Sequence, residues 1–491
     1  MTAAAYDPSM ILAILPEIGL IVLGVLVLAF DLAWKEERRR NIGWVSSFGL
    51  LVIAVLTVVF SHPAGNSGLV WGGMLRWDWL SFVFEMIALA GAAITSLFAM
   101  DSGLIGKRGE FYLLLLASTF GMILMGGAAD LVMLFLAIEM TSIPLYVLAG
   151  FSYKDARSTE SGFKYFLFGA TTSAVMLYGF SLLAGLTGTT QIYQMAPVIQ
   201  SGGLPLFALI GVLMLILVGF SFKISAVPFQ FWAPDVYEGA PTPVAGFLST
   251  ASKAAGFAVL IRFLVAVFPA AQPAPSVHTY WVLLLAIVST ATMILGNVLA
   301  LAQKNIKRLV AYSSIAQAGY ILIGVVAASG LGISGSVYYL IAYLLTNLAA
   351  FGVITIVGRM TGSDDVSAYA GLSRRSPGLA LVLLVAFLSL AGIPPFGGFF
   401  AKVLVFAAAV DSHLVWLAVV GIINSVIALY YYLTVLKVAY LYRSEDETRP
   451  AAISRPWTIA LVVCVLGIIV IGTLIGPWFN WSTLAANSLF G

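Results

Sequence analysis

The sequence has few charged residues for its length and therefore little of what a soluble surface needs. Of its 491 residues, 9% are charged and 61% are hydrophobic, whereas soluble domains are roughly 25% charged. This composition excludes an ordinary soluble globular protein. Apolar runs of about 20 residues, long enough to cross a bilayer, recur along the whole chain. The sequence predicts an all-α polytopic membrane protein.

Side chains that hold redox groups are also scarce. The single cysteine, Cys464, can form neither an iron–sulfur cluster nor an internal disulfide. The histidines His62, His278 and His413 fall in predicted loops or at span ends, so no pair of them could hold a haem. No glycine-rich phosphate loop follows a strand. We therefore expect no cofactor or metal on this chain, and partners must carry any electrons.

The apolar runs predict about fourteen membrane-spanning helices. Their approximate limits are 8–31, 42–60, 78–100, 111–128, 130–150, 160–186, 205–234, 241–269, 280–302, 307–329, 333–359, 378–410, 412–441 and 456–478.

Lysine and arginine alternate between the connections that join these spans. The first connection carries Lys35 and three arginines at 38–40, whereas the second carries only Arg76. By the positive-inside rule, the odd-numbered connections are cytoplasmic and both termini are periplasmic. The seventh connection, around Asp235 and Glu238, is the exception because it lacks the expected positive charge.

Some ionisable residues remain inside the predicted spans, where they are costly and usually line an ion path. They are Glu17, Glu85, Glu139, Lys164, Lys223, Lys253, Arg262, Lys402 and Lys437. With a rise of about 1.5 Å per residue, four of them lie near the middle of their spans. These four are Glu139, Lys223, Lys253 and Lys402.

Each of these residues could also have a purely structural role. Lys164, Arg262 and Lys437 lie nearer to span ends, where long side chains reach back to the interface. Glu17 and Glu85 could bond to neighbouring hydroxyls, face a subunit contact or take part in transport. Static ion pairs could hold the four central residues. However, three lysines and one glutamate leave charge unpaired, which makes a purely structural network expensive.

Two of the central lysines lie beside prolines that break their helices. Lys223 precedes Pro228, and Lys402 follows Pro394 and Pro395. Paired interrupted helices in two halves of a chain indicate a transport site. The two breaks are five spans apart, which predicts two five-helix repeats that are inverted relative to each other. The predicted regions are 1–110 with three leading helices, 111–269 and 280–441 as the repeats, and 442–491 with a trailing helix.

The residue types suggest a mechanism. Lysine exchanges its proton readily when buried, whereas arginine stays charged. We therefore hypothesise that Glu139 forms an ion pair with Lys223. Breaking this pair would drive a proton along a water-linked row through Lys253 toward Lys402.

The chain resembles the antiporter-like membrane subunits of respiratory complex I, which are related to subunits of multi-component cation/proton antiporters. The resemblance covers nearly the whole chain. It is carried by "LFLAIEMTSIPLYVLAGF", "FSFKISAVPFQFWAPDVYEGAPTPV", "STASK", "NIKRLVAYSSIAQAGY" and "GIPPFGGFFAK". The segments "GEFYLLLLASTFGMILMGGAADLVMLFLAIEM" and "STESGFKYFLFGA" are most similar to the subunit N group of bacterial NADH-quinone oxidoreductases.

The resemblance implies fourteen helices with two inverted five-helix repeats and a proton path. The path residues would be Glu139, Lys164, Lys223, Lys253 and Lys402. Lys164 would link the Glu139 end to the central row. NADH, flavin, iron–sulfur clusters and quinone would be bound by partner subunits. Other complex I membrane subunits would flank both lateral faces within the lipid bilayer of the bacterial inner membrane, and protons and water would occupy the path. No nucleic acid is expected.

Three alternatives follow from the same residues. The chain could be a subunit of a multi-component sodium/proton antiporter, because the same lysines and glutamate would serve that exchange. It could belong to the subunit M group of the same complex. It could also be a scaffold that only fills the membrane arm, although unpaired midplane lysines count against that function.

Overall fold

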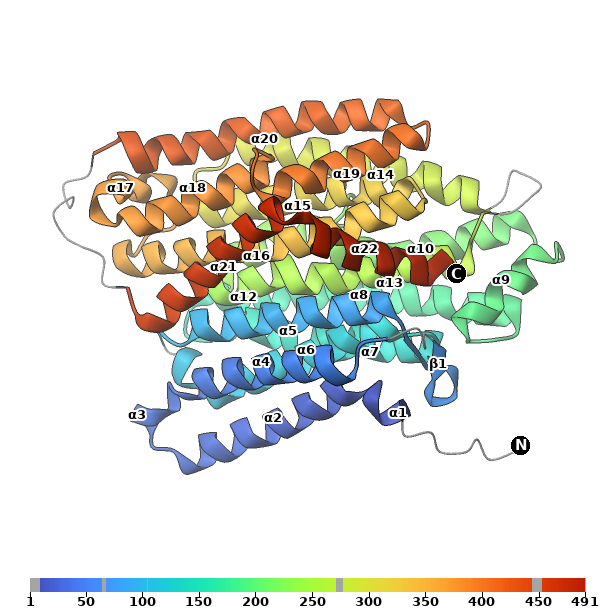
Figure 1. Ribbon diagram of the computed structural model, residues 1–491, viewed down its shortest axis with the longest axis horizontal. Coiled ribbons are helices and arrows are strands. Elements are labelled where there is room, and N and C mark those ends of the chain that lie inside the picture. The colour runs from blue at the N-terminus through green and yellow to red at the C-terminus, as the bar shows by residue number, and fades with distance from the viewer. Residues whose placement is uncertain (1–8, 64–67, 104, 271–276, 444–452, 491) are drawn as a thin grey trace.

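The structure is a computed structural model that describes the chain except for residues 1–8, 64–67, 104, 271–276, 444–452 and 491. Long helices run side by side along the longest dimension of the molecule (Figure 1). Among the described residues, 13 helices are long and apolar enough to cross a membrane. Two shorter helices at 377–411 form one further interrupted span. Together they account for the fourteen predicted spans.

The leading part contains three predicted spans and a short β-hairpin. Its elements are α1 (Ser9–Leu12), α2 (Leu15–Ala33), α3 (Glu36–Arg39), α4 (Ile42–Phe60), β1 (Gly68–Val70), η1 (Trp71–Gly73), β2 (Leu75–Trp77), α5 (Trp79–Ala99) and η2 (Ile105–Lys107). The two strands pair antiparallel, with Leu69 opposite Arg76. The all-helical prediction missed this hairpin. Its turn depends on Gly72, whose φ of 68° suits glycine.

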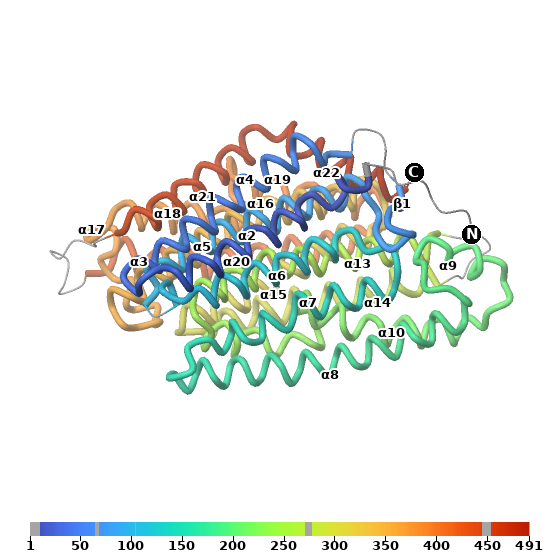
Figure 2. The backbone as a smooth tube through the Cα atoms, turned by 90° about the horizontal axis from the view of Figure 1, so that it is seen from below, coloured from blue at the N-terminus to red at the C-terminus, as the bar shows by residue number. Residues whose placement is uncertain are grey.

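The middle of the chain supplies the next five spans. Its elements are α6 (Gly109–Gly127), α7 (Leu131–Ala149), α8 (Ala156–Thr187), α9 (Ile192–Gln200), α10 (Leu206–Ile224), α11 (Trp232–Gly239), α12 (Thr242–Phe247), η3 (Leu248–Ser252) and α13 (Lys253–Val267). Figure 2 shows α8 along an outer edge of the bundle.

The remaining elements complete the bundle. They are α14 (Val277–Leu301), α15 (Ile306–Val326), α16 (Gly330–Thr361), η4 (Val366–Tyr369), α17 (Leu372–Arg375), α18 (Pro377–Ala391), α19 (Gly397–Asp411), α20 (Val415–Leu441), α21 (Arg455–Thr473) and α22 (Ile475–Phe490). The helices α15 and α16 form the centre, because 94% of the apolar window of each is buried, compared with 28% for α2. Helices that are apolar all round are expected in such a position.

Both spans that were predicted to be broken are interrupted. The helix α10 ends at Ile224, and Pro228 lies in the non-helical segment before α11. The helix α18 ends at Ala391, and Pro394 and Pro395 lie before α19. The sequence did not predict a third irregularity, the π-helical turn η3 inside the eighth span. Such single turns are frequent at functional sites.

Two parts of the chain share local details. The long helices α8 and α16 each have 32 residues and end at a glycine with positive φ, Gly188 and Gly362. The helices α7 and α15 each begin at a side-chain cap, Asp130 and Asn305. The first cap residue bridges to Gln191 just after α8, and the second to Asp365 just after α16. The two local arrangements therefore use the same contacts in the same order.

The expectation that Arg262 reaches the membrane interface is wrong. Arg262 is only 1% exposed, and its guanidinium donates two hydrogen bonds of 2.7 Å to the carboxylate of Asp78. It also donates to the hydroxyl of Tyr193 at 2.6 Å and to the carbonyl of Gly126 at 3.0 Å. Arg76 contacts the same carboxylate at 3.1 Å. A planar guanidinium satisfied on several sides is stable at this depth, so Arg262 joins α13 to the N-terminus of α5.

This pair yields a prediction about stability. We expect R262A to lower the free energy of unfolding by about 3–5 kcal/mol, because it leaves the Asp78 carboxylate buried without its main partner. Thermal unfolding of the purified protein in detergent measures the change. K437A is the matched control, since Lys437 is exposed and its loss is expected to cost less than about 0.5 kcal/mol. Equal effects of the two substitutions would contradict the structural role of Arg262.

Candidate functional site

The first broken span places Lys223 in the last turn of α10, where its positive charge suits the helix C-terminus. Lys223 is 6% exposed, and its Nζ donates to Ser142 Oγ of α7 at 2.9 Å. The break leaves backbone groups that side chains satisfy. The indole of Trp232 donates to the Phe222 carbonyl at 3.1 Å, and Thr292 Oγ1 accepts from the amide that precedes Pro228 at 3.0 Å.

The hypothesised direct ion pair between Glu139 and Lys223 is not formed. The two side chains make no N–O contact within 4.0 Å, and Lys223 binds Ser142, about one turn further along α7 from the glutamate. Glu139 is half-buried, and its Oε1 is buried without a hydrogen-bond partner. The hydrogen-bond partner of Lys223 on α7 is therefore Ser142 and not the predicted Glu139. Spacing along one helix could not distinguish these neighbouring turns.

Lys253 lies directly after the π-helical turn η3, at the centre of the bundle. It is 2% exposed. Its Nζ donates to the Oγ and the carbonyl of Ser314 on α15, at 2.7 and 3.0 Å. The hydroxyl of Tyr343 donates to the same Ser314 Oγ at 2.8 Å. Asn347 in turn donates to Tyr343 at 3.0 Å. Polar side chains of α15 and α16 therefore surround this amine.

Lys402 lies in α19 just after the second break and is 4% exposed. Its Nζ donates to the Ala391 carbonyl at 3.0 Å and to Ser425 Oγ at 2.7 Å. It also lies 4.8 Å from the centre of the Tyr320 ring, a favourable position for a cation. The broken end of α18 thus supplies a carbonyl oxygen that an intact helix would use for its own backbone.

The predicted lysines share one feature. Within the described part of the chain, Lys223, Lys253 and Lys402 form no ion pair within 4.0 Å. Serine hydroxyls and backbone carbonyls take the place of carboxylates as acceptors. Such oxygens can solvate either an ammonium group or an amine.

Residues that the sequence analysis did not select connect the last two lysines. Gln317 lies about one turn after Ser314 on α15, and its amide donates to the Leu390 carbonyl at 3.1 Å and to the Tyr432 hydroxyl at 3.3 Å. Tyr339 donates to the amide oxygen of Gln317. Leu390 is adjacent to the carbonyl that accepts from Lys402. The signal for this row is the helical spacing of Ser314 and Gln317 within "SSIAQ".

Lys164 lies apart from this row, in an open pocket of about 560 Å³. It pairs with Glu160 at 2.6 Å and with Asp235 at 2.8 Å. Arg308 contacts Asp235 and Glu238, both at 2.8 Å. These contacts explain why the seventh connection has no basic residue of its own, since α8 and α15 supply the cations. Lys164 makes no ion pair with Glu139.

Asp235 is the anion shared by the two cations in this pocket. Burial acts to raise its pKa, but hydrogen bonds from Lys164 and Arg308 outweigh burial and hold the pKa of Asp235 below its ordinary value. Asp235 therefore stays ionised at physiological pH. The pocket therefore holds ion-paired side chains that stay charged and lie next to the first broken span.

The comparisons with known proteins show the family of this chain. Residues 128–428 match the family described as NADH:quinone oxidoreductase/Mrp antiporter, transmembrane. The chain is 41% identical over 473 residues to NADH-quinone oxidoreductase subunit N of Heliobacterium modesticaldum, covering 96% of this chain and 97% of that relative. It belongs to the subunit N family of NADH-quinone oxidoreductases. The protein of the same name from Moorella thermoacetica is 40% identical over 478 residues and covers 96% and 98% of the two chains.

Solved structures support the same family. A chain of respiratory complex I from Thermus thermophilus with bound aureothin is 32% identical, with a TM-score of 0.78 over 95% of this chain and 98% of that chain. A chain of the Mrp complex from Dietzia sp. has a TM-score of 0.85 over 99% and 98%, but at 20% identity it shows the fold alone. The expected family and the preference for the subunit N group over subunit M are confirmed.

The geometry of the second break gives a prediction about Lys402. Gly392 has a φ of +86°, and a Cβ there would lie 2.9 Å from Lys402 Cδ. We expect G392A to displace the lysine and reduce proton translocation severalfold in assembled membranes, as measured by fluorescence quenching.

G188A is the matched control for that substitution. Gly188 has a φ of +71° and open space around its Cα, so both alanines carry a similar backbone penalty of about 1–2 kcal/mol. Only G392A touches a lysine of the row. Equal translocation by the two variants would show that Lys402 tolerates displacement.

Asp235 yields a prediction about pH. Because its folded-state pKa is depressed, its ion pairs contribute stability that is complete above the unfolded-state pKa of about 3.9. This contribution is lost as pH falls through the lower folded-state value. We expect D235N to lower the unfolding temperature by a constant amount between about pH 5 and 8. The exposed partner Glu160 provides the control E160Q, and a D235N effect that varies across this range would contradict the assignment.

Proposed function

We propose that this chain translocates protons as the subunit N of a membrane-bound NADH:quinone oxidoreductase. The observation that carries the proposal is the trio Lys223, Lys253 and Lys402. Each amine is buried, lies within about two turns of a break or a π-helical turn in its span, and is bound by hydroxyl or carbonyl oxygens. A scaffold would gain nothing from three buried amines without carboxylate partners.

The proposed relay begins at Glu139 and passes to Lys223 through the turn of α7 that carries Ser142. It continues through Lys253 and ends at Lys402. Contacts support the last section most strongly, because Ser314, Gln317 and the consecutive carbonyls of residues 390 and 391 form an almost continuous polar row. Water is proposed to complete the links between these groups.

Lys164 is proposed to act at the edge of this relay. Its pocket lies between α8 and α11, which pack against each other, and α11 directly follows the first break. With Asp235 held as an anion, Lys164 has a fixed partner outside the central row. We propose that movement of Lys164 between Asp235 and the Glu139 end adjusts the field on Lys223.

We also propose that residues 111–269 and 280–441 are inverted repeats. The matching caps Asp130 and Asn305, and the matching glycines after α8 and α16, support this proposal. The residue before the first cap, Ala129, lies by the β-hairpin, whereas Asn305 contacts Glu238. In Figure 1 the hairpin and α17, which follows the second bridge, lie at opposite ends of the bundle. Opposite ends are expected for inverted copies with an odd number of spans.

The energy for translocation is proposed to come from partner subunits. NADH oxidation and quinone reduction would occur there, on flavin, iron–sulfur clusters and quinone. Glu139 lies beside an exposed apolar face of α7, which includes Leu136 and Met140. The helix α20 exposes a second apolar face, which includes Ile423 and Val426. We propose that neighbouring membrane subunits of the complex cover both faces.

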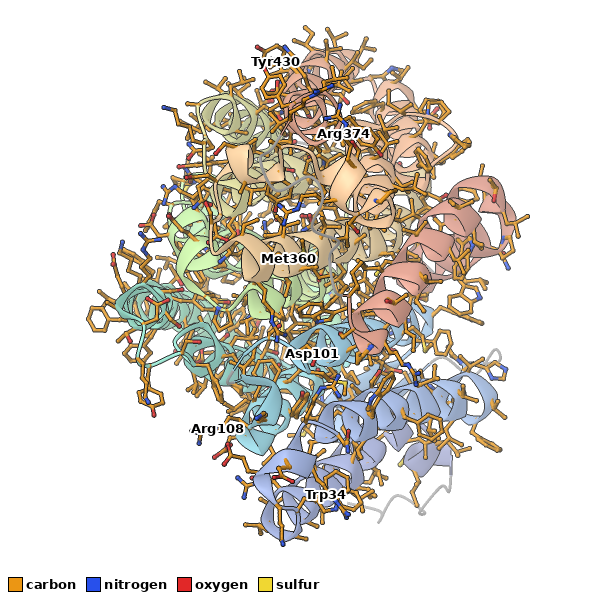
Figure 3. The ribbon with its side chains drawn as sticks, turned by 90° about the vertical axis from the view of Figure 1, so that its left-hand side faces the viewer. Trp34, Asp101, Arg108, Met360, Arg374 and Tyr430 are labelled. Atoms are coloured by element: carbon orange, nitrogen blue, oxygen red, sulfur yellow. The ribbon has the colours of Figure 1, made fainter. Side chains whose placement is uncertain are left out.

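The proposed location is the bacterial inner membrane, with both termini periplasmic. Basic residues support this orientation. Figure 3 looks onto one end of the bundle and shows Arg108 and Arg374 there with Asp101. Arg40 donates two hydrogen bonds to the Asp101 carboxylate at 2.7 and 2.9 Å. These arginines come from odd-numbered connections, so this end would face the cytoplasm.

The experiment that tests the function replaces Lys253 in the assembled complex. We expect K253R to retain assembly and positive charge but to lower proton translocation per NADH oxidised by on the order of tenfold or more, because arginine does not release its proton. K253A should lose translocation as well. Inverted membrane vesicles measure acidification and NADH oxidation together.

K437A is the control for assembly and membrane quality, since Lys437 is exposed and outside the row. Normal translocation by K253R would overturn the relay. The antiporter alternative is supported by the Mrp-like fold and by a family description that includes the Mrp antiporter. It predicts that translocation by the unmodified chain depends on sodium, whereas the proposed function predicts the same rate in potassium.

A further inference from the structure

The first two lysines of the row come close together on α13. The helix α10 packs against α13, and a Cβ built on Gly256 of α13 would lie 3.1 Å from Lys223 Cγ and 3.0 Å from Ile224 Cγ2. The side chain of Lys223 therefore lies directly against this glycine. Gly256 follows Lys253 by three residues, which is about one helical turn. The missing side chain at Gly256 thus lets Lys223 approach the part of α13 that carries Lys253.

The amines of these two lysines nevertheless bind different helices. Lys223 Nζ donates to Ser142 on α7, whereas Lys253 Nζ donates to Ser314 on α15. In the described part of the chain, no series of side-chain hydrogen bonds joins one amine to the other. A proton that passes between them needs a further group that can accept and donate it.

Tyr237 of α11 lies beside this section of the row. The centre of its ring is 6.0 Å from Lys253 Nζ, and it packs edge-on against Trp232 with ring centres 6.0 Å apart. The indole of Trp232 donates to the carbonyl of Phe222, the residue before Lys223, and the two rings have centres 5.1 Å apart. These contacts place Tyr237 between Lys253 and the last turn of α10.

The hydroxyl of Tyr237 has no partner among the described residues. Tyr237 is 0% exposed, and its hydroxyl oxygen is buried without a hydrogen bond. The ring also packs edge-on against Phe351 of α16, with centres 6.1 Å apart. A phenylalanine would make the same ring contacts, whereas an unpaired buried hydroxyl costs free energy. Packing alone therefore does not explain the hydroxyl.

Two further buried oxygens without protein partners lie near these lysines. Ser225 is the C-cap of α10, two residues after Lys223, and its Oγ forms no hydrogen bond. Asn347 donates to Tyr343, which belongs to the polar group around Lys253, while its Oδ1 remains without a partner. Buried polar groups of this kind usually bind ordered water. This section therefore has polar atoms that can hold water near both lysines.

Ion pairs fix the short helix that carries Tyr237. The helix α11 packs against α8 and α15, and Arg308 of α15 contacts both Asp235 and Glu238 of α11 at 2.8 Å. The same helix, α15, supplies Ser314, which binds Lys253. One helix thus sets the positions of both Tyr237 and the lysine beside it.

We propose that Tyr237 is the proton-relay residue between Lys223 and Lys253, a role that rests on the proposed function. The Lys223 ammonium group releases one proton to bound water. The Tyr237 hydroxyl accepts a proton from this water and passes its own proton on to the Lys253 amine. At the end Lys223 is neutral and Lys253 is an ammonium group, while the tyrosine and the water are unchanged.

The variant Y237F in the assembled complex tests this role. We expect the number of protons translocated per NADH oxidised to fall by on the order of tenfold, because phenylalanine cannot accept or donate a proton. Assembly and the unfolding temperature are expected to stay unchanged, since the ring remains and the lost hydroxyl has no protein partner. Inverted membrane vesicles measure acidification and NADH oxidation together.

Y338F is the matched control. Tyr338 is also 0% exposed, but its hydroxyl donates to the carbonyl of Ile471 at 2.8 Å, outside the lysine row. This substitution is expected to lower the unfolding temperature and to leave translocation unchanged, which is the opposite of the pattern expected for Y237F.

Replacement of Tyr237 by 3-fluorotyrosine, incorporated at a suppressed stop codon, separates the hydroxyl from the packing of the ring. This side chain keeps the hydroxyl and nearly the same volume. We expect it to restore the translocation that Y237F loses.

Three results would overturn the proposal. They are normal translocation by Y237F, an equal loss of translocation by Y338F, and failure of 3-fluorotyrosine to restore translocation in an assembled complex. The K253R experiment keeps this inference separate from the proposed function. Normal translocation by K253R would reject the relay as a whole, whereas loss by K253R with normal translocation by Y237F would reject only the role of Tyr237.

Discussion

Backbone polar groups that lie at membrane depth need partners within the protein, because the lipid offers none. This constraint explains the architecture around the first break. Ending α10 at Ile224 frees backbone groups, and the indole of Trp232 and the hydroxyl of Thr292 bind them. Only a bundle with many packed helices can bring such side chains together. The centre of the molecule is accordingly its most buried part, and there Lys253 binds Ser314.

Buried cationic side chains are bound by two different kinds of partner in this structure. Arg262 forms a bidentate ion pair with Asp78 and also donates to Tyr193 and to the Gly126 carbonyl, which suits a fixed structural joint. Lys223 and Lys253 instead bind serine oxygens and have no carboxylate partner. The residue types match these roles, since arginine keeps its proton and lysine exchanges it. The helix α13 thus carries one buried cation of each kind, the paired Arg262 and the hydroxyl-bound Lys253.

Much of the fold follows from the pattern of the sequence. Apolar runs define the spans because a helix needs about 20 apolar residues to cross the hydrocarbon core of a bilayer. The prolines at 228 and 394–395 define the breaks, because proline removes a backbone donor. The hairpin at Gly68–Trp77 and the π-helical turn before Lys253 were not predicted. Both depend on local backbone geometry that leaves no periodic signal.

The sequence by itself determined the class of the protein, its spans and breaks, and which buried ionisable residues to examine, because composition and helical rise are local properties. Only the tertiary structure decided their partners. It placed Ser142, rather than Glu139, at Lys223, and it brought Arg308 and Lys164 to Asp235 from distant helices. Contacts between helices depend on packing and rotation about their axes, which spacing along one chain does not specify.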